Sequence, residues 1–398
     1  MDTFFQNSEN FQKAHIGIFV MDVQTGKEIF SRNSNQFFIP ASLQKIPTSL
    51  AALSLLGKDY LFFTDLEYEG EIKENILYGN VWIRGGGDPT LPLDIVNTWE
   101  KALHKKNIFS INGSIFVDAS FFETVSVPPS WSFQDIGNYY GAGASSLTIH
   151  NNFYIITFQP GVKEGESAKI LSLYPPIFDL VYHNEVTTGA AKSGDQVCIF
   201  GSEYSPIQFY RGTVPIDVPS FSVKAAIFDP PLFAGRLLQE KIPATNGVKV
   251  FRTKNFSKNP ANILHCHTSP PLAKIIQDMN LHSINLFAEH LFKAMGEGKS
   301  EIGRKRIETF LQSNQIEASI QDGSGLSSTN LWTPKDFVHL LCIIRKSPFF
   351  PTIYDSLSEM GKSGTLQKWT SIKNGVIKAK TGSMSHIYNL RGYLFLPL

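Results

Sequence analysis

The spacing of apolar and polar positions predicts a strand pair and a helix in the first sixty residues. Residues 15–32, HIGIFVMDVQTGKEIFSR, alternate apolar and polar side chains before a Gln-Thr-Gly turn, which predicts a β-hairpin. Residues 39–57 follow with a leucine- and alanine-rich spacing that suits a buried helix ending at Gly57. Pro47 would lie beyond the first turn of this helix, where we expect it to remove a backbone donor and bend the helix.

The pattern changes in the central part of the chain. From about residue 62 to 261, short β-like runs such as SSLTIHNNFYIITFQPG are separated by glycine and proline. This texture predicts one or two mostly β modules inserted into a larger domain. We assign an inserted β domain to residues 62–159 and 213–261, and a small nested β module to residues 160–212.

Helical periodicity returns after residue 268. The stretches PPLAKIIQDMN, INLFAEHLFKAMG and TPKDFVHLLCIIRKS are amphipathic, and two strands, GVIKAKTGSM and YNLRGYLFLPL, close the chain. Strands at both ends with helices between them predict an α/β (α+β) domain whose antiparallel sheet is flanked by helices and unites the termini. This discontinuous domain would comprise residues 1–61 and 262–398.

Composition and charge narrow the classes of partner. The 398 residues are 42% hydrophobic and 18% charged. A chain of this length and composition can bury one large hydrophobic core or two to three ordinary ones, so we expect a multi-domain globular protein. The 36 basic and 35 acidic residues form no basic run that would follow a phosphate backbone, so we expect no nucleic-acid partner. No stretch approaches the roughly 18 apolar residues of a membrane span, and the amino terminus does not resemble a leader peptide. We therefore expect no transmembrane segment, and a leader removed beforehand if the protein is exported.

The cysteines do not indicate a metal site or a disulfide framework. Cys198, Cys266 and Cys342 are odd in number and far apart. The short cluster His265–His267 lacks a matching second pair of ligands, so we expect it to be structural. The sequence predicts no metal and no cofactor.

Ser42 and Lys45 form the first candidate for chemistry. Positions three apart lie on one face of a helix, so the hydroxyl and the amine can reach hydrogen-bonding distance. The pair alone is weak evidence, because two residue types at a fixed offset recur about once or twice by chance in such a chain. A helix cap and a solvated lysine explain the same two residues.

Two further motifs make the catalytic interpretation the stronger one. Ser283 and Asn285 open an amphipathic helix, and Lys380-Thr381-Gly382 lies on the penultimate predicted strand. The order Ser-x-x-Lys, Ser-x-Asn, Lys-Thr-Gly is the signature of penicillin-binding proteins and serine β-lactamases.

Each motif residue has a physical task in that chemistry. Serine is a weak nucleophile until a base activates it, and Lys45 serves as that base only if burial and a nearby positive charge, such as Lys380, keep it neutral. Ser283 would relay a proton to the leaving amine, and Asn285 would bind the substrate's amide. Gly382 has no side chain, which lets a substrate backbone approach the strand.

The sequence resembles the low-molecular-mass class C penicillin-binding proteins, the D-alanyl-D-alanine carboxypeptidase/endopeptidase family of peptidase family S13. A long insertion between the first two motifs is typical of that family. Other stretches resemble it too, namely GGGDPTL, HTSPPLAKIIQDMN, AEHLFKAMG, DGSGLS and SGTL. The resemblance implies a transpeptidase-like catalytic domain carrying inserted β domains.

The resemblance also implies the reaction. Ser42 would attack the carbonyl between two D-alanines of a peptidoglycan stem peptide, and water would hydrolyse the acyl-enzyme. Backbone amides of Ser42 and Ser383 would form the oxyanion hole, while Lys380, Thr381 and Ser383 would hold the terminal carboxylate. β-Lactams would acylate the same serine, and the location would be periplasmic or otherwise extracytoplasmic.

A subsite for the diamino acid of the stem peptide is implied in PPSWSFQDIGNYYGA, residues 128–142. Trp131 and Tyr140 would line it, Asp135 would pair with the free amine, and Met384 would close it. The alternative is that Trp131 and Tyr140 are core aromatics and that Asp135 caps a turn.

Two departures keep other functions open. Ile284 replaces a residue that is often polar in the family, and the chain stops soon after Lys380, where the family fold continues into a strand and a helix. We therefore expect an open sheet edge, completed by further chain, by a partner or in a homo-oligomer. The alternatives are a β-lactamase, although no Glu-x-x-x-Asn segment is evident in a suitable position, and a non-catalytic peptidoglycan-binding scaffold.

Overall fold

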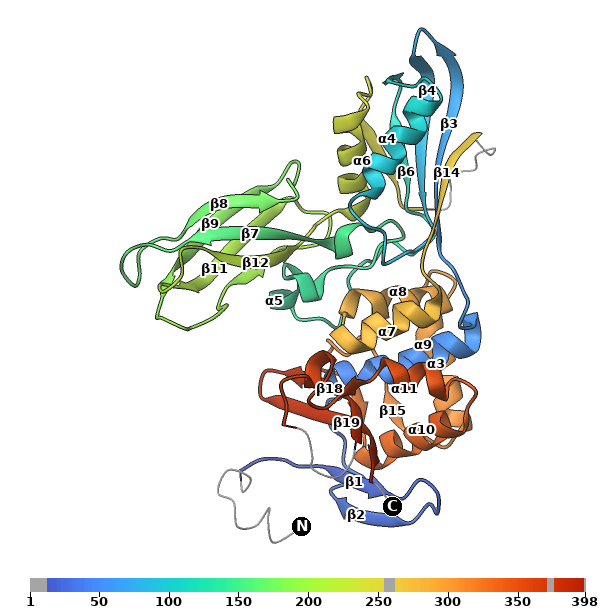
Figure 1. The fold of residues 1–398 in the computed structure, drawn as a ribbon, viewed down its shortest axis with the longest axis vertical. Coiled ribbons are helices and arrows are strands. Elements are labelled where there is room, and N and C mark those ends of the chain that lie inside the picture. The colour runs from blue at the N-terminus through green and yellow to red at the C-terminus, as the bar shows by residue number, and fades with distance from the viewer. Residues whose placement is uncertain (1–12, 254–261, 371–375, 397–398) are drawn as a thin grey trace. The chain divides into compact units, whose positions relative to one another are not determined.

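The computed structural model describes residues 13–253, 262–370 and 376–396 (Figure 1). The chain forms two compact units. The first comprises Met1–Leu55, Ile276–Ser283 and Arg304–Leu398, and the second comprises Leu56–Ile275 and Ile284–Gly303. The residues around the first and third motifs therefore fold together, and the long insertion forms most of the other unit.

The first unit begins with the predicted hairpin and helix. The strands β1 (Ile18–Met21) and β2 (Glu28–Arg32) pair antiparallel. A 3₁₀ turn, η1 (Ala41–Gln44), then leads into α3 (Lys45–Leu56). The α-helix begins at Lys45, so Pro47 lies in its first turn. Backbone N–H groups in the first turn have no partner within the helix, so a proline there costs no helical hydrogen bond. The expectation that Pro47 lies beyond the first turn and removes a helical hydrogen bond was wrong.

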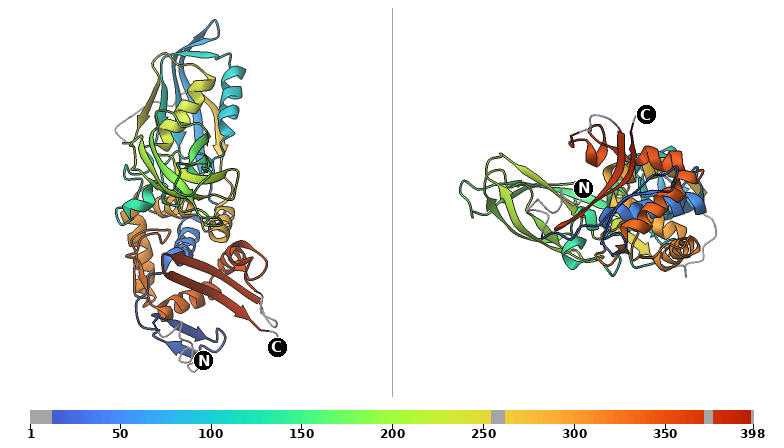
Figure 2. Two further views of the ribbon diagram at one scale, coloured as in Figure 1. Left: turned by 90° about the vertical axis from the view of Figure 1, so that its left-hand side faces the viewer. Right: turned by 90° about the horizontal axis from the view of Figure 1, so that it is seen from below.

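The remainder of the first unit contains helices and two short sheets. Its helices are α10 (Pro334–Lys346), α11 (Phe350–Ser356), and the carboxyl-terminal parts of α7 (Leu272–His282) and α9 (Ser300–Ser313). Strands β15 (Ala318–Ser319) and β16 (Leu331–Trp332) pair together. A second antiparallel sheet has the order β17 (Ser358–Glu359), β18 (Val376–Met384), β19 (Ile387–Phe395), its last two strands shown in red in Figure 2.

The two termini do not share one sheet, contrary to the expectation from the sequence. Within the described residues, no pairing joins the amino-terminal hairpin to β19. The hairpin strands satisfy each other's backbone groups, and β1 packs against α10, with the rings of Phe19 and His339 6.2 Å apart edge to face. The hairpin and the two closing strands were correctly predicted, but their union in one sheet was not.

The second unit contains a six-stranded sheet covered on one face by helices. The sheet order is β13-β6-β4-β3-β14, with β5 paired to β4; the bounds are β3 (Phe63–Lys73), β4 (Ile76–Gly85), β5 (Ser110–Asn112), β6 (Ile115–Asp118), β13 (Val248–Phe251) and β14 (Asn262–Thr268). Helices α4 (Ile95–Lys105) and α6 (Pro230–Lys241) pack on it (Figure 1). Trp99 and Leu103 of α4 and Val117 of β6 are fully buried in this layer.

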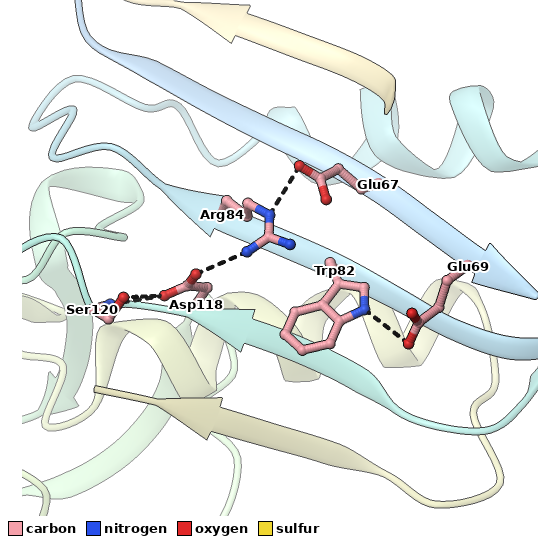
Figure 3. A network of polar contacts seen from close by, with 6 residues as sticks. All are labelled: Glu67, Glu69, Trp82, Arg84, Asp118 and Ser120. Atoms are coloured by element: carbon pink, nitrogen blue, oxygen red, sulfur yellow. Dashed lines mark hydrogen bonds and ion pairs between the residues drawn. The ribbon is translucent and has the colours of Figure 1, made fainter. Parts of the chain in front are cut away.

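Paired charges lie on the same sheet, as Figure 3 shows. The guanidinium of Arg84 donates to Glu67 over 2.9 Å and to Asp118 over 3.0 Å, which joins three neighbouring strands. The Trp82 indole donates to Glu69 over 3.3 Å. Glu67 is only 5% exposed, so its ion pair with Arg84 offsets the free energy of burying the carboxylate.

Two three-stranded sheets complete the inserted region. One has the order β12-β7-β8 and the other β10-β11-β9; the bounds are β7 (Phe153–Gln159), β8 (Lys169–Tyr174), β9 (Val181–Gly189), β10 (Cys198–Phe200), β11 (Ile207–Pro215) and β12 (Phe221–Ala226). Strand β8, from the predicted nested module, pairs with β7, which precedes that module. The division into inserted domain and nested module stays a prediction, and its boundary at residue 261 lies outside the described residues.

The second unit also contains three short helices and α8. They are α5 (Phe133–Ile136), η2 (Tyr139–Gly141), η3 (His150–Asn152) and α8 (Asn285–Met295). Through the ranges that the structure describes, every helix is too short or too polar to traverse a lipid bilayer.

Candidate active site

Ser42 and Lys45 are hydrogen-bonded at the junction of η1 and α3. The Lys45 Nζ lies 3.0 Å from the Ser42 Oγ and also donates to the Ser324 carbonyl over 2.8 Å. Lys45 is fully buried, whereas Ser42 is partly exposed. Ala41, directly before the serine, has a φ of 47°, a left-handed conformation that is unfavourable for alanine. This turn presents the hydroxyl and holds the amine against it.

The loop that supplies the Ser324 carbonyl is rigid. The buried Asp322 carboxylate accepts hydrogen bonds from the backbone amides of Gly325 and Ser327, each over 2.8 Å, and from the Asn330 amide over 2.8 Å. Gly325 has a φ of 84°, and a Cβ there would lie 1.8 Å from the Ala41 carbonyl oxygen. The DGSGLS stretch therefore packs directly on the turn that carries Ser42.

Lys380 extends this arrangement from β18. Its Nζ donates to the Ser283 Oγ over 2.8 Å and to the Thr381 carbonyl over 2.8 Å. Burial, and then the positive charge of Lys45, hold the pKa of Lys380 well below the usual value for lysine. Two ammonium groups are thus coupled inside one unit, and the pair gives up its first proton more readily than an isolated lysine would.

Ser283 adopts a strained conformation. Its φ of 57° lies in the left-handed region, which disfavours a residue with a Cβ by about 1–2 kcal/mol. The residue lies between the end of α7 at His282 and the start of α8 at Asn285. The sharp turn there brings the hydroxyl to Lys380, which is the contact that a proton relay requires.

Gly382 brings β18 against the nucleophile's turn. A Cβ at this position would lie 2.5 Å from the Pro40 carbonyl oxygen and 3.1 Å from the Ser42 amide nitrogen. The sequence suggested that the missing side chain at Gly382 lets a substrate backbone approach β18. In the structure it also lets the backbone around Ser42 lie directly against this strand. Asn389 of β19 supports the same junction, because its amide donates to the Ile39 carbonyl over 3.0 Å.

Thr381, Ser383 and Met384 lie on β18 beside Lys380 and Gly382. The Thr381 hydroxyl donates to the Thr365 hydroxyl over 2.7 Å, Ser383 is exposed, and Met384 ends the strand. Thr365 belongs to the SGTL stretch, to which the sequence alone gave no role. Exposed polar groups at Thr381 and Ser383 beside a buried lysine are suited to binding an anion.

Asn285 belongs to the second unit, where it is the first residue of α8. Its Nδ2 donates to the Tyr140 carbonyl over 2.8 Å. The predicted site residues are therefore divided. Ser42 with Lys45 and Ser283 with Lys380 form two hydrogen-bonded pairs in the first unit, whereas the hydrogen bond from Asn285 to Tyr140 lies in the second.

Helix α8 is anchored in the second unit by buried basic groups. Lys293 donates to the carbonyls of Val125 and Ala144 over 2.6 and 3.0 Å, and the His290 Nδ1 lies 2.9 Å from the Gly87 carbonyl. Burial lowers the pKa of Lys293 to about 8 and that of His290 to about 3. Sequence reasoning gave these groups no role, although AEHLFKAMG, which contains both, and GGGDPTL, which contains Gly87, were noted as similar to the family.

The residues of the predicted diamino-acid subsite also lie largely in the second unit. Trp131 is buried with 6% exposure, Tyr140 is 37% exposed, and Asp135 lies on α5. Burial raises the pKa of Asp135, and the nearby Tyr140 hydroxyl partly opposes that shift. Met384 is on β18 in the first unit.

No metal-binding group is evident in the described part of the chain, where no three His, Cys, Asp or Glu side chains converge suitably. His265, Cys266 and His267 lie on β14 and pair in register with β3.

Comparison with known proteins gives one family and several relatives. Residues 1–396 match the sequence model of the D-Ala-D-Ala carboxypeptidase 3 (S13) family. The chain is 28% identical over 405 residues to the D-alanyl-D-alanine carboxypeptidase of Actinomadura sp. (strain R39), covering 95% of this chain and 74% of the relative. It is 25% identical over 399 residues to the D-alanyl-D-alanine carboxypeptidase DacB of Haemophilus influenzae, covering 96% of this chain and 82% of that relative.

Solved structures agree with the fold. The crystal structure of penicillin binding protein 4 (dacB) from Haemophilus influenzae superposes with a TM-score of 0.80 at 24% identity, over 94% of this chain and 86% of that one. The structure of the same protein complexed with a β-lactam gives a TM-score of 0.75 at 25% identity, over 96% of this chain and 86% of that one. This chain therefore has a penicillin-binding transpeptidase-like fold with additional β-rich domains, as expected from the sequence.

Gly382→Ala tests the contact between β18 and the turn of Ser42. The added methyl group would press on the Pro40 carbonyl and the Ser42 amide, and overpacking of about 1–3 kcal/mol would slow labelling of Ser42 by a fluorescent penicillin by about tenfold or more. Gly392→Ala is the matched control, because its Cβ would meet Lys378 on the same sheet instead. Equal slowing by both substitutions would contradict a specific role for the Gly382 contact.

Proposed function

The chain belongs to the D-Ala-D-Ala carboxypeptidase 3 (S13) family, and from that premise we propose which of its residues carry out the reaction. It is a serine DD-peptidase of peptidoglycan, a hydrolase that cleaves D-alanyl-D-alanine peptides and is a penicillin-binding protein. The observation that carries the assignment of roles is the hydrogen bond between the Lys45 Nζ and the Ser42 Oγ, next to the buried Lys380.

Ser42 is the proposed nucleophile. Its Oγ attacks the carbonyl carbon between the two D-alanines while its proton passes to the Lys45 Nζ, 3.0 Å away. This transfer requires an unprotonated amine, and the mutual repulsion of Lys45 and Lys380 favours loss of a proton from the pair. The Ser324 carbonyl keeps Lys45 oriented in either protonation state.

The developing oxyanion is stabilised by backbone amides of Ser42 and Ser383 in this proposal. Donors of this kind are worth about 3–4 kcal/mol each in a measured case, so the positions of the two amides matter as much as the nucleophile. The absence of a side chain at Gly382 supports the assignment, since it allows β18 to approach the Ser42 amide.

Ser283 completes the first half-reaction. The C–N bond breaks, the leaving amine of the terminal D-alanine takes a proton from the Ser283 hydroxyl, and Ser283 regains one from the lysine pair through Lys380. Lys380, Thr381 and Ser383 hold the carboxylate of the terminal D-alanine. Asn285 binds the amide of the substrate.

Water completes the second half-reaction. It attacks the ester carbonyl, the ester bond to Ser42 breaks, and Ser42 recovers its proton while the shortened peptide leaves. The same sequence of steps on a cross-linked peptide is an endopeptidase reaction. A β-lactam enters by the first half-reaction and acts as an inhibitor if its ester persists.

The diamino-acid subsite is proposed to consist of Trp131, Asp135, Tyr140 and Met384. The partly buried Asp135 carboxylate supports an ion pair with the free side-chain amine of the substrate, and such charge-assisted bonds are among the stronger polar contacts.

The location is proposed to be outside the cytoplasmic membrane, where peptidoglycan is the substrate. Recovery of the native protein solely with the cytosol after cell fractionation would contradict this location.

Covalent labelling tests the nucleophile. A fluorescent penicillin is expected to label the wild-type protein, and Ser42→Ala is expected to abolish the label, because the ester oxygen comes from that side chain. Ser54→Ala is the matched control on the same helix, since its hydroxyl donates only locally to the Leu50 carbonyl. Release of D-alanine from a stem pentapeptide by the wild type then measures peptidase activity.

Three outcomes would point elsewhere. Labelling that persists in Ser42→Ala would remove Ser42 from the mechanism. Rapid hydrolysis of penicillin without release of D-alanine would favour a β-lactamase, and binding of stem peptide without labelling or turnover would favour a scaffold.

Asp135→Ala tests the subsite. The substitution is expected to raise KM for peptides with a free side-chain amine by about tenfold, and to affect the same peptides much less when the amine is acetylated. Asp195→Ala is the control, because Asp195 is another carboxylate of the inserted region whose pKa is raised by burial. Equal losses with free and acetylated peptides would refute the ion pair.

A further inference from the structure

Three hydroxyl groups meet at Thr365 in the first unit. Thr365 belongs to η4 (Gly364–Leu366), and its Oγ1 accepts a hydrogen bond from the Thr381 hydroxyl over 2.7 Å. The Ser358 Oγ lies 3.3 Å from the same atom and accepts from the Thr365 backbone amide over 3.1 Å. Thr365 therefore connects β17, which contains Ser358, to the third motif on β18.

The turn that carries Thr365 is held closely against β17. Gly364 has a φ of 55°, and a Cβ there would lie 2.2 Å from the Ser358 Oγ, so the turn approaches the strand as closely as a glycine allows. Leu366 is fully buried, and its carbonyl accepts from the Gly361 amide over 3.0 Å. The backbone of Thr365 is therefore fixed on both sides.

Each hydroxyl supplies one hydrogen, and counting them shows which one is available to a ligand. The Thr381 hydrogen is used in its bond to Thr365. Ser358 is fully buried, and among the described residues the Thr365 Oγ1 is the one acceptor for its hydrogen. Because a buried donor is costly to leave unpaired, Ser358 donates to Thr365 as well. Thr365 thus accepts twice, and its own hydrogen meets no acceptor in the described part of the chain.

This hydrogen belongs to a row of accessible polar groups. Thr365 is exposed and Thr381 is half-buried. Ser383 is also exposed and, two residues along β18, lies on the same face of the strand as Thr381. The two hydrogen bonds that the Thr365 oxygen accepts polarise its O–H group and make it a stronger donor. A polarised, accessible donor is suited to an anion.

We propose that Thr365 is a further substrate-binding residue, which donates its hydroxyl hydrogen to the terminal carboxylate of the substrate. The inference rests on the proposed function, in which Lys380, Thr381 and Ser383 hold that carboxylate. A carboxylate only accepts hydrogen bonds, so Thr381 cannot bind it with the hydrogen that it gives to Thr365. Thr365 supplies a hydrogen in its place, and Thr381 contributes by holding and polarising Thr365.

Acylation by benzylpenicillin and by its methyl ester tests this role, because both probes react at the β-lactam carbonyl but only the acid carries a carboxylate. Thr365→Val keeps the shape of the side chain and removes the hydroxyl. It is expected to lower the second-order rate constant about tenfold or more with the acid, and at most about threefold with the ester. Thr365→Ser keeps a hydroxyl and is expected to restore reaction with the acid to within about threefold of the wild type.

Thr352→Val is the matched control. It makes the same replacement on α11 in the same unit, where the Thr352 hydroxyl has no hydrogen-bond partner among the described residues. This variant is expected to react at the wild-type rate with both probes. The midpoint of thermal unfolding is measured for each variant, and Thr365→Ala takes the place of Thr365→Val if the valine variant does not fold.

Two results would overturn the role of Thr365 and leave the proposed function standing. One is reaction of Thr365→Val with the acid at the wild-type rate. The other is slowing by the same factor with acid and ester, which a displaced β18 would produce. Failure of benzylpenicillin to acylate the wild type would instead refute the proposed function, and equal wild-type rates with acid and ester would refute its carboxylate site.

Discussion

The arrangement of this site depends on two lysines whose charges repel each other in a buried place. Lys45 and Lys380 are both fully buried, and the charge of Lys45 contributes to lowering the pKa of Lys380. Water would normally stabilise both ammonium groups, and here backbone carbonyls of Ser324 and Thr381 replace it. The repulsion makes a proton easier to lose from the pair, as the proposed activation of the Ser42 hydroxyl requires.

The fold maintains this unfavourable pair through close backbone contacts. Gly382 and Gly325 each approach the turn around Ser42 more closely than any other residue type could. Ala41 and Ser283 hold left-handed conformations beside the groups they position, and such strain persists only where the surrounding packing enforces it. Gly382, Gly325 and Ala41 take no chemical part in the proposed reaction, yet they fix the distances between the groups that would take part in it.

The candidate side chains could be proposed from the sequence because their types and order are written in it. The structure pairs Ser42 with Lys45 and Ser283 with Lys380 by hydrogen bonds, and the charge of Lys45 acts on Lys380. Contacts made by carbonyls of Ser324 and Tyr140 could not be predicted, since every residue carries the same backbone group. The sheet pairing of the termini was also wrong, because alternation identifies a strand but not its partner.

The pH dependence of acylation tests the lysine pair most directly. Because a proton must leave the pair first, the second-order rate constant for benzylpenicillin should rise with pH through a midpoint well below 10.5, the ordinary lysine value. Lys380→Met removes one of the two repelling charges, so it should shift that midpoint to higher pH as well as lowering the rate. A midpoint that does not move in Lys380→Met would contradict the coupled pair.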